Sequence, residues 1–164
     1  MKILLISGDS GTGKTLIANK LAEQENYHLI KSFTDRPQRS GTTYNDHQFV
    51  SKAIMKFILT YDIAAFTTID GYHYCATFSQ FDNKKINVYV VDKKGIDDIK
   101  EHFKDAQIYS ILVIKDNVHI DQSRKDRNIV IPTPEDVDMV LENNTNINDV
   151  VKNLKQTISL FFEG

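Results

Sequence analysis

The stretch Gly8-Asp9-Ser10-Gly11-Thr12-Gly13-Lys14-Thr15 follows the pattern G-x-x-x-x-G-K-[ST]. An apolar run at 3–6 precedes it and predicts a buried strand, and the apolar spacing after it predicts a helix over 14–25. A strand, a glycine-rich turn and a helix in this order form the context of a phosphate-binding loop. The backbone N–H groups of the turn and the helix N-terminus then point at phosphate oxygens. We therefore expect the chain to bind a nucleoside triphosphate.

The individual positions of this loop predict an ATP and Mg²⁺ site. Lys14 is expected to reach the β and γ phosphates, and the Thr15 hydroxyl to ligate Mg²⁺. The remaining positions would cradle the phosphates of ATP: Gly8, Ser10, Gly11, Thr12 and Gly13.

Composition limits the alternatives. A length of 164 residues with 41% hydrophobic and 26% charged residues favours one globular domain. The net charge of −2 makes a nucleic-acid partner unlikely, since such proteins are usually basic. Cys75 is the single cysteine, which excludes an intrachain disulfide and indicates a cytoplasmic protein. No apolar run approaches the length of a membrane span, so no membrane partner is expected, and nothing indicates an oligomeric state.

Predicted strands and helices alternate along the chain. Strands are expected over 2–7, 28–32, 63–69, 72–77, 86–91 and 108–114, and helices over 14–25, 51–61, 96–103 and from 147 onward. Asp70-Gly71 predicts a hairpin turn, while 33–47 and 115–128 are expected to be loops. The stretch 128–144 stays open: it offers a strand at 129–131, and either a helix over 134–141 or a strand at 139–142. The alternation indicates an α/β fold, with a parallel sheet covered by helices on both faces.

The last helix has the clearest pattern. Asn146 is expected to cap it, with Asp149 in an arrangement like a capping box. Its apolar stripe consists of Ile147, Val150, Val151, Leu154, Ile158 and Phe161.

Arg36 and Arg39 form a second group that points to phosphate. Two arginines three positions apart, in a segment that follows a strand, provide guanidinium forks that bind phosphate oxygens bidentately. They could hold the phosphate of a monophosphate acceptor, or they could be a solvated surface pair.

Several motifs resemble those of the guanylate kinase family. Ser32, Arg36, Arg39 and Gly41 match the family pattern S-x-x-T-R-x-P-R-x-G, although the proline is shifted by one position. Further segments are similar to its D-Y-x-F, its G-N-x-Y-G-[ST] and its strand ending in D-x-x-G: Asp46–Phe49, Gly71–Ala76 and Val88–Gly95.

The resemblance implies a P-loop NTPase-type core over 1–32 and 85–164. It also implies a small, mostly antiparallel subdomain over 33–84 that binds a nucleoside monophosphate, and a short lid over 115–128. The acceptor would be bound by Ser32, Arg36, Arg39, His47, Tyr74 and Asp92, with His47 in place of a family tyrosine.

The departures from the family concern the base. A family carboxylate and a family hydroxyl that contact guanine fall on Ala65 and Ala76. A monophosphate acceptor is therefore better supported than guanine itself, and Thr67, Thr68 or Asp62 could supply a replacement polar group.

Asp92 has three possible roles. As a carboxylate at a strand end it could hold Mg²⁺ through water. It could contact the acceptor base, as the resemblance implies, or simply cap the helix over 96–103.

The lid of this chain would be short. Arg124 and Arg127 within it could reach the phosphates as catalytic groups beside Lys14, Arg36 and Arg39, or could belong to a solvated charge run. A short lid predicts slow transfer or leakage into hydrolysis.

The leading hypothesis is a nucleoside monophosphate kinase that uses ATP and Mg²⁺. One alternative is a guanylate-kinase-like binding module, or a P-loop ATPase with little kinase activity. Another is a P-loop kinase for a different small acceptor or a polynucleotide end. Cys75 is expected to be a packing residue rather than a nucleophile.

Overall fold

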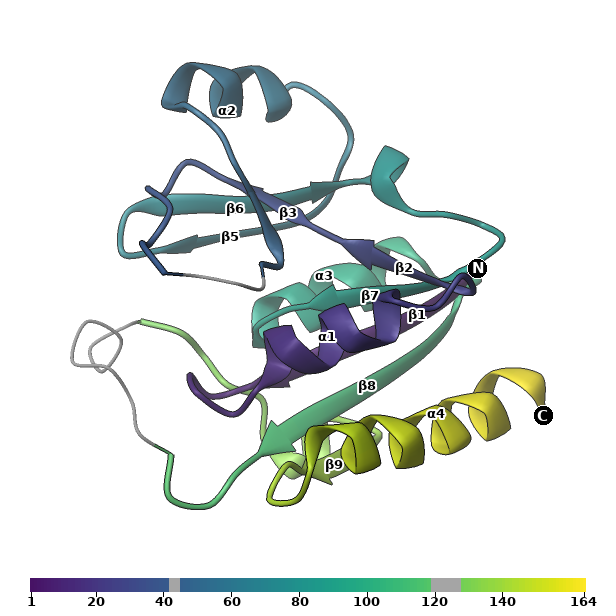
Figure 1. Cartoon of the computed structure of the whole chain (residues 1–164). Coiled ribbons are helices and arrows are strands. Elements are labelled where there is room, and N and C mark those ends of the chain that lie inside the picture. The colour runs from purple at the N-terminus through teal and green to yellow at the C-terminus, as the bar shows by residue number, and fades with distance from the viewer. Residues whose placement is uncertain (42–44, 119–127) are drawn as a thin grey trace.

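The computed structural model describes residues 1–41, 45–118 and 128–164 (Figure 1). Five strands form a core sheet in the order β2-β7-β1-β8-β9, and each neighbouring pair is parallel. Its strands are β1 (Lys2–Gly8), β2 (Tyr27–Ile30), β7 (Ile86–Val90), β8 (Gln107–Ile114) and β9 (Met139–Glu142). Parallel strands place their carboxyl ends at one edge, where ligands bind in sheets of this kind.

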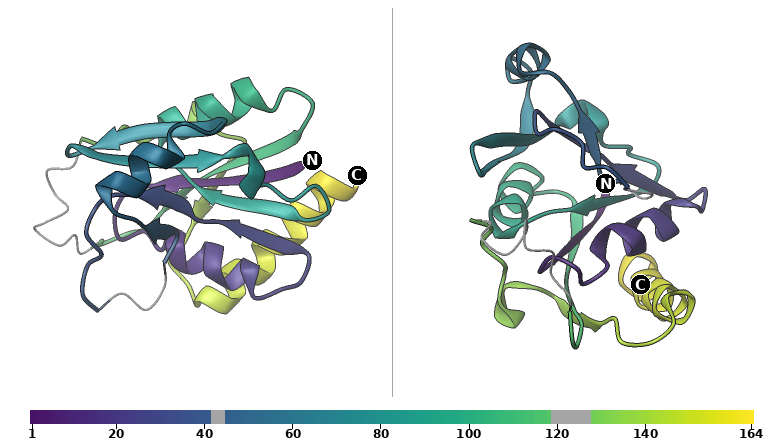
Figure 2. Two further views of the ribbon diagram at one scale, coloured as in Figure 1. Left: turned by 90° about the horizontal axis from the view of Figure 1, so that it is seen from above. Right: turned by 60° about the vertical axis from the view of Figure 1, so that its left-hand side comes forward.

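Helices cover both faces of the core sheet. Figure 2 shows α1 (Lys14–Ala22) and α4 (Ile147–Glu163) on one face and α3 (Lys93–His102) on the other. Alternate β1 residues serve the two faces: Leu4 and Ile6 pack in the cluster with α1 and α4, while Ile3 and Leu5 pack with α3. This is why β1 is a continuous apolar run rather than an alternating one.

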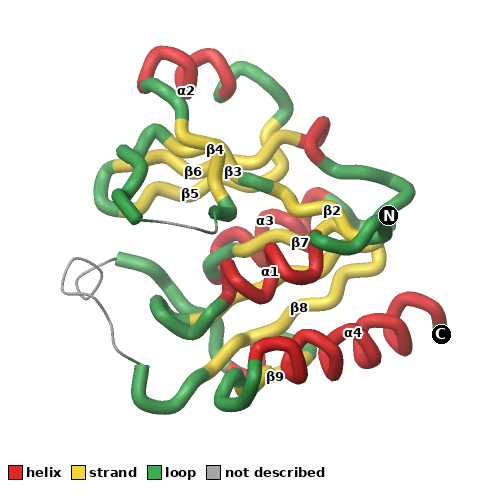
Figure 3. The backbone as a smooth tube through the Cα atoms, viewed as in Figure 1, coloured by secondary structure: helices red, strands yellow, loops and turns green. Residues whose placement is uncertain are grey.

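A second, four-stranded sheet packs over the α3 side of the core sheet (Figure 3). Its order is β4-β3-β6-β5, with one parallel pair, β3 with β4, and two antiparallel pairs. The elements are β3 (Ser32–Thr34), β4 (His47–Phe49), α2 (Lys52–Ile58), β5 (Ile63–Ile69), β6 (Tyr72–Thr77) and the 3₁₀ turn η1 (Phe78–Gln80). Met55 and Ile58 of α2 bury Cys75 of β6.

The fold class predicted from the sequence is confirmed. The hairpin at Asp70-Gly71 is also confirmed: both residues have positive φ, of 53° and 79°, as a tight two-residue turn between twisted strands requires. In the ambiguous stretch the strand β9 forms, preceded by a single 3₁₀ turn, η3 (Pro134–Asp136), whereas residues 129–131 form no strand.

Three predicted details were wrong. The expected loop over 33–47 contains β3 and the start of β4, whose three-residue strands are stabilised by pairing within the small sheet rather than by local pattern. Helix α3 begins at Lys93, because the Asp92 side chain accepts a hydrogen bond from the Gly95 N–H and caps it. In α4 the buried aromatic residue is Phe162, while Phe161 is 39% exposed and stacks on Tyr109.

Helix α3 also fixes the small sheet to the core. Among the residues that the structure describes, β5 is an edge strand with no strand neighbour on this side, so its backbone groups need other partners. Asp98 accepts from the Phe66 N–H at 3.0 Å, and Lys94 donates to the Phe66 carbonyl at 2.7 Å. His102 Nδ1 lies 2.7 Å from the Ala64 carbonyl oxygen. These contacts hold β5 at the edge of the pocket described below.

No helix in the described ranges has the length and apolar character needed to cross a membrane.

Candidate active site

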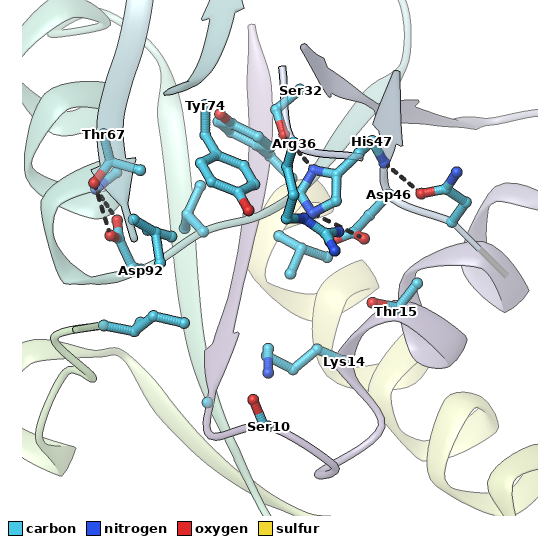
Figure 4. Close-up of a pocket in the computed structure, with 18 of the residues that line it drawn as sticks. Ser10, Lys14, Thr15, Ser32, Arg36, Asp46, His47, Thr67, Tyr74 and Asp92 are labelled. Atoms are coloured by element: carbon cyan, nitrogen blue, oxygen red, sulfur yellow. Dashed lines mark hydrogen bonds and ion pairs between the residues drawn. The ribbon is translucent and has the colours of Figure 1, made fainter. Parts of the chain in front are cut away.

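A pocket of about 430 Å³ lies where the phosphate loop faces the small sheet. The core contributes the loop after β1, the end of β7 and the segment around Ile129 and Ile131, while the small sheet contributes β3, β4, β5 and β6. Figure 4 shows the loop residues Ser10 and Lys14 below, and Arg36, Tyr74 and His47 above. The pocket is therefore built by two parts of the chain that each present polar groups.

The loop backbone has a shape that only glycine allows at two positions. Gly8 has φ of 147°, and a Cβ there would lie 2.4 Å from the Val113 carbonyl oxygen. Gly13 has φ of 93°, and its Cβ would lie 2.4 Å from Nδ2 of Asn143. Both contacts are far inside van der Waals separation, so a side chain at either position would open the loop.

Polar contacts within the loop hold its shape. Lys14 Nζ donates to the Asp9 carbonyl at 2.7 Å, and the Thr12 hydroxyl donates to the same oxygen at 2.8 Å. Asn143, which follows β9, donates from its side-chain amide to the Thr12 carbonyl at 2.8 Å. Six of the seven predicted ATP-binding residues line the pocket: Gly8, Ser10, Gly11, Gly13, Lys14 and Thr15. Thr12 is instead buried beneath the loop, where its side chain supports the backbone.

Arg36 and Arg39 line the same pocket as Lys14. The Arg36 guanidinium lies over the Phe49 ring, with 5.5 Å between Cζ and the ring centroid. Arg36 Nε and the Tyr74 hydroxyl are buried and have no hydrogen-bond partner among the described residues. Buried donors are almost always paired, so two such groups at one cavity indicate a ligand that supplies acceptor oxygens.

His47 connects the predicted acceptor residues. Its Nδ1 lies 2.8 Å from the Ser32 hydroxyl and its Nε2 lies 3.5 Å from an Asp46 carboxylate oxygen. Its ring packs edge-on against Tyr74 with the centroids 5.3 Å apart. Ser32, His47 and Tyr74 thus form one contact group beside Arg36 (Figure 4).

Asp92 caps α3 and lines the pocket at the end of β7. One carboxylate oxygen accepts from the Gly95 N–H at 2.8 Å, and the other accepts from the Thr67 hydroxyl at 3.2 Å. Figure 4 places it across the pocket from Thr15, so the two predicted Mg²⁺ ligands do not lie together. Within the described residues, no group of three His, Cys, Asp or Glu side chains is arranged to hold a metal ion.

The base-contact positions agree with the sequence interpretation in part. Ala65 lines the pocket and brings no polar group, and Thr67 lines it two residues along the same strand. Thr68 and Asp62 are exposed and do not line it. Arg124 and Arg127 lie outside the described residues. Sequence reasoning missed Phe49 and Asn143, although Phe49 falls in the segment Asp46–Phe49 that carries the family resemblance.

Comparisons with known proteins agree with this architecture. The fold is similar to that of the crystal structure of guanylate kinase from Anaplasma phagocytophilum, with a TM-score of 0.71 and 21% sequence identity. The similarity covers 97% of this chain and 85% of that chain. No family model and no curated protein sequence matches the chain. The chain therefore has the guanylate kinase fold, which confirms at the level of structure the resemblance seen in the motifs.

Proposed function

We propose that this protein is a nucleoside monophosphate kinase, which transfers the γ-phosphoryl group of ATP to the phosphate of a nucleoside monophosphate. One observation supports this most strongly: the phosphate loop and Arg36 and Arg39 line a single pocket. The related guanylate kinase fold makes a nucleotide acceptor the natural expectation.

The donor would bind at the loop. Backbone N–H groups of the loop and Lys14 would hold the β and γ phosphates of ATP. Mg²⁺, when bound, would neutralise charge on these phosphates, and the Thr15 hydroxyl at the start of α1 is the group suited to ligate it. Asp92 lies across the pocket from Thr15, so we assign it to the acceptor rather than to the metal.

The acceptor phosphate would bind between Arg36, Arg39 and Tyr74. Arg36 Nε and the Tyr74 hydroxyl supply buried donors that a phosphate would satisfy. An oxygen of this phosphate attacks the γ-phosphorus while the bond from the γ-phosphorus to the β,γ-bridging oxygen breaks, and ADP leaves with those electrons. Charge stabilisation by Lys14 and the arginines, together with alignment, would provide the catalysis. Arg124 and Arg127 remain predicted contributors from the lid.

A binding module without catalysis is the alternative, favoured by the apolar residue Ala65, which lines the pocket where the family has a base-contacting carboxylate. The supported loop argues against it, because Asn143 and the glycine geometry maintain a phosphate-binding shape that such a module would not need. Calorimetric titration with ATP separates the two, since a module should show no measurable affinity.

The direct test is ADP release measured with a panel of ribo- and deoxyribonucleoside monophosphates. At least one acceptor should stimulate ADP release, and Lys14→Met should lower kcat by at least about 100-fold. Lys20→Met is a matched control on the same helix, because Lys20 pairs with Glu23 away from the pocket. ADP release that no monophosphate stimulates would reject the kinase and indicate an ATPase.

A further inference from the structure

One side of the pocket is formed by the inner face of β5. Ala65, Thr67 and Ile69 are alternate residues of this strand and line the cavity together. Ala65 and Ile69 are apolar, so among these three residues Thr67 provides the polar side-chain atom. It lies next to Asp92, which reaches the same cavity from the end of β7.

The hydrogen bond between these two residues fixes what they offer to a ligand. A carboxylate has no proton to donate, so the Thr67 hydroxyl must give its proton to Asp92, across 3.2 Å. The other Asp92 oxygen accepts from the Gly95 N–H at 2.8 Å. With that proton used, the Thr67 oxygen and the spare lone pairs of Asp92 are acceptors only.

The backbone around Thr67 is held firmly. The carbonyl of its neighbour Phe66 accepts a hydrogen bond from Lys94, and the Phe66 N–H donates one to Asp98. Both partners belong to α3. Asp92 is fixed as the cap of the same helix. The two acceptors therefore have a set position rather than an adjustable one, which selective recognition requires.

The location suits the base of a bound monophosphate. Figure 4 shows Thr67 and Asp92 on one side of the pocket, Arg36 and His47 on the other, and Tyr74 between them. A phosphate bound at Arg36 and Tyr74 would leave the base to extend toward Thr67 and Asp92.

We infer that Thr67 is a specificity-determining residue, and that together with Asp92 it selects nucleoside monophosphates whose base bears an amino group. This inference rests on the proposed function. An amino group donates to the acceptors that Thr67 and Asp92 present. A carbonyl oxygen at the same position would face the Thr67 and Asp92 oxygens, and none of these atoms has a proton to share. The base and the protein would then both keep unpaired acceptors, which disfavours a carbonyl-bearing base strongly.

The test compares acceptors with and without the amino group, by calorimetric binding to the full chain. CMP and UMP form one pair, and GMP and IMP form another. The pair to judge is the one that contains the tightest-binding of these four acceptors. In that pair, the member with the amino group should bind at least about tenfold more tightly than the member without it. Ribose 5-phosphate, which has no base, serves as the reference for phosphate binding alone.

Three variants assign the preference to the named atoms. Thr67→Val keeps the shape of the side chain and removes the oxygen, so the preference should fall at least about threefold. Thr67→Ser keeps the hydroxyl and should retain the preference. Asp92→Asn still caps α3 but presents an amide donor, so the preference should disappear or turn toward UMP over CMP. Ribose 5-phosphate binding should stay close to wild type in all three, which separates a lost base preference from a lost fold.

Two results overturn the inference in distinguishable ways. If monophosphates and ribose 5-phosphate bind but both members of each pair bind equally, or if Thr67→Val keeps the full preference, the assignment of Thr67 is wrong and the proposed function stands. If no monophosphate binds at all, the proposed function fails and the inference fails with it.

Discussion

Asn143 donates a buried hydrogen bond of 2.8 Å to the carbonyl of Thr12, linking the end of the last core strand to the first loop of the chain. The same amide nitrogen occupies the space that any side chain at position 13 would need. The shape of the phosphate loop therefore depends on a residue 131 positions away in sequence.

Asn143→Ala should weaken both folding and ATP binding. It leaves the Thr12 carbonyl without its partner in a buried position, which costs about 1–3 kcal/mol of unfolding free energy. The loop loses its support, so ATP should bind more weakly, by about tenfold. Urea unfolding and ATP calorimetry measure the two effects.

Asn144→Ala is the matched control for that change. Asn144 is exposed and pairs with Asp116 through its side-chain oxygen and nitrogen, at 2.8 and 3.1 Å. Its removal should change ATP affinity little. Equal ATP affinity in both variants would show that Asn143 does not support the loop.

Tyr74→Phe should lower acceptor affinity without lowering stability. In the protein without ligand it removes a buried hydroxyl that has no partner among the described residues, so stability should stay the same or rise by about 1 kcal/mol. Acceptor affinity should fall, since the hydroxyl is expected to donate to the phosphate. Thermal unfolding without ligand and monophosphate titration give the two numbers.

The control for Tyr74→Phe is Tyr61→Phe, a hydroxyl removed from an exposed ring on the same subdomain. It should affect neither quantity. A loss of stability in Tyr74→Phe with unchanged acceptor affinity would mean that this hydroxyl serves the fold and not the ligand.

Local signals predicted the parts of the structure that are formed locally. The glycines at 8 and 13 and the Asp70-Gly71 turn require backbone angles that few other residues accept, so their sequence alone identifies them. The arginine pair needed the family resemblance, because two exposed arginines and two phosphate-binding arginines have the same spacing. The structure supplied the missing fact, that Arg36 and Arg39 line the same cavity as Lys14.

Features that depend on tertiary contacts could not be predicted. Strand β4 has three residues and exists through pairing with β3, so no pattern of its own marks it. Asp92 fits a cap, a metal ligand or a base contact equally well as a letter in the sequence. The structure shows that Asp92 caps α3 and also accepts a hydrogen bond from Thr67, 25 positions away in sequence. This second contact places Asp92 beside the row of β5 side chains that lines the pocket.

Cys75 should resist thiol reagents in the folded protein. Burial raises the pKa of its thiol to about 11, and the negative charge of Asp35 adds to this. At pH 8, three units lower, about one thiol in a thousand is the reactive thiolate. An aromatic disulfide reagent should therefore react with the unfolded chain and only very slowly with the native one. Rapid stoichiometric labelling of the native protein would contradict the burial of this residue beside Met55.

Asp35 should make part of the folding stability depend on pH in the acidic range. Burial alone would raise its pKa, but hydrogen bonds from the His73 side chain and N–H outweigh burial and place the pKa below the ordinary 3.8. A carboxyl group with a lowered pKa in the folded state stabilises the protein above its unfolded pKa. That contribution is lost as the pH falls through the folded value.

Asp35→Asn should therefore be less stable than wild type at pH 7, by about 1–3 kcal/mol, because the amide cannot accept both bonds from His73 as the carboxylate does. Between pH 7 and pH 3 the variant should lose less stability than wild type, so the difference between them narrows. Urea unfolding across this range measures it, with the exposed Asp105→Asn as the control that should follow wild type. If the free energy of unfolding changes with pH in the same way for Asp35→Asn and wild type, the Asp35–His73 contact makes no pH-dependent contribution to stability.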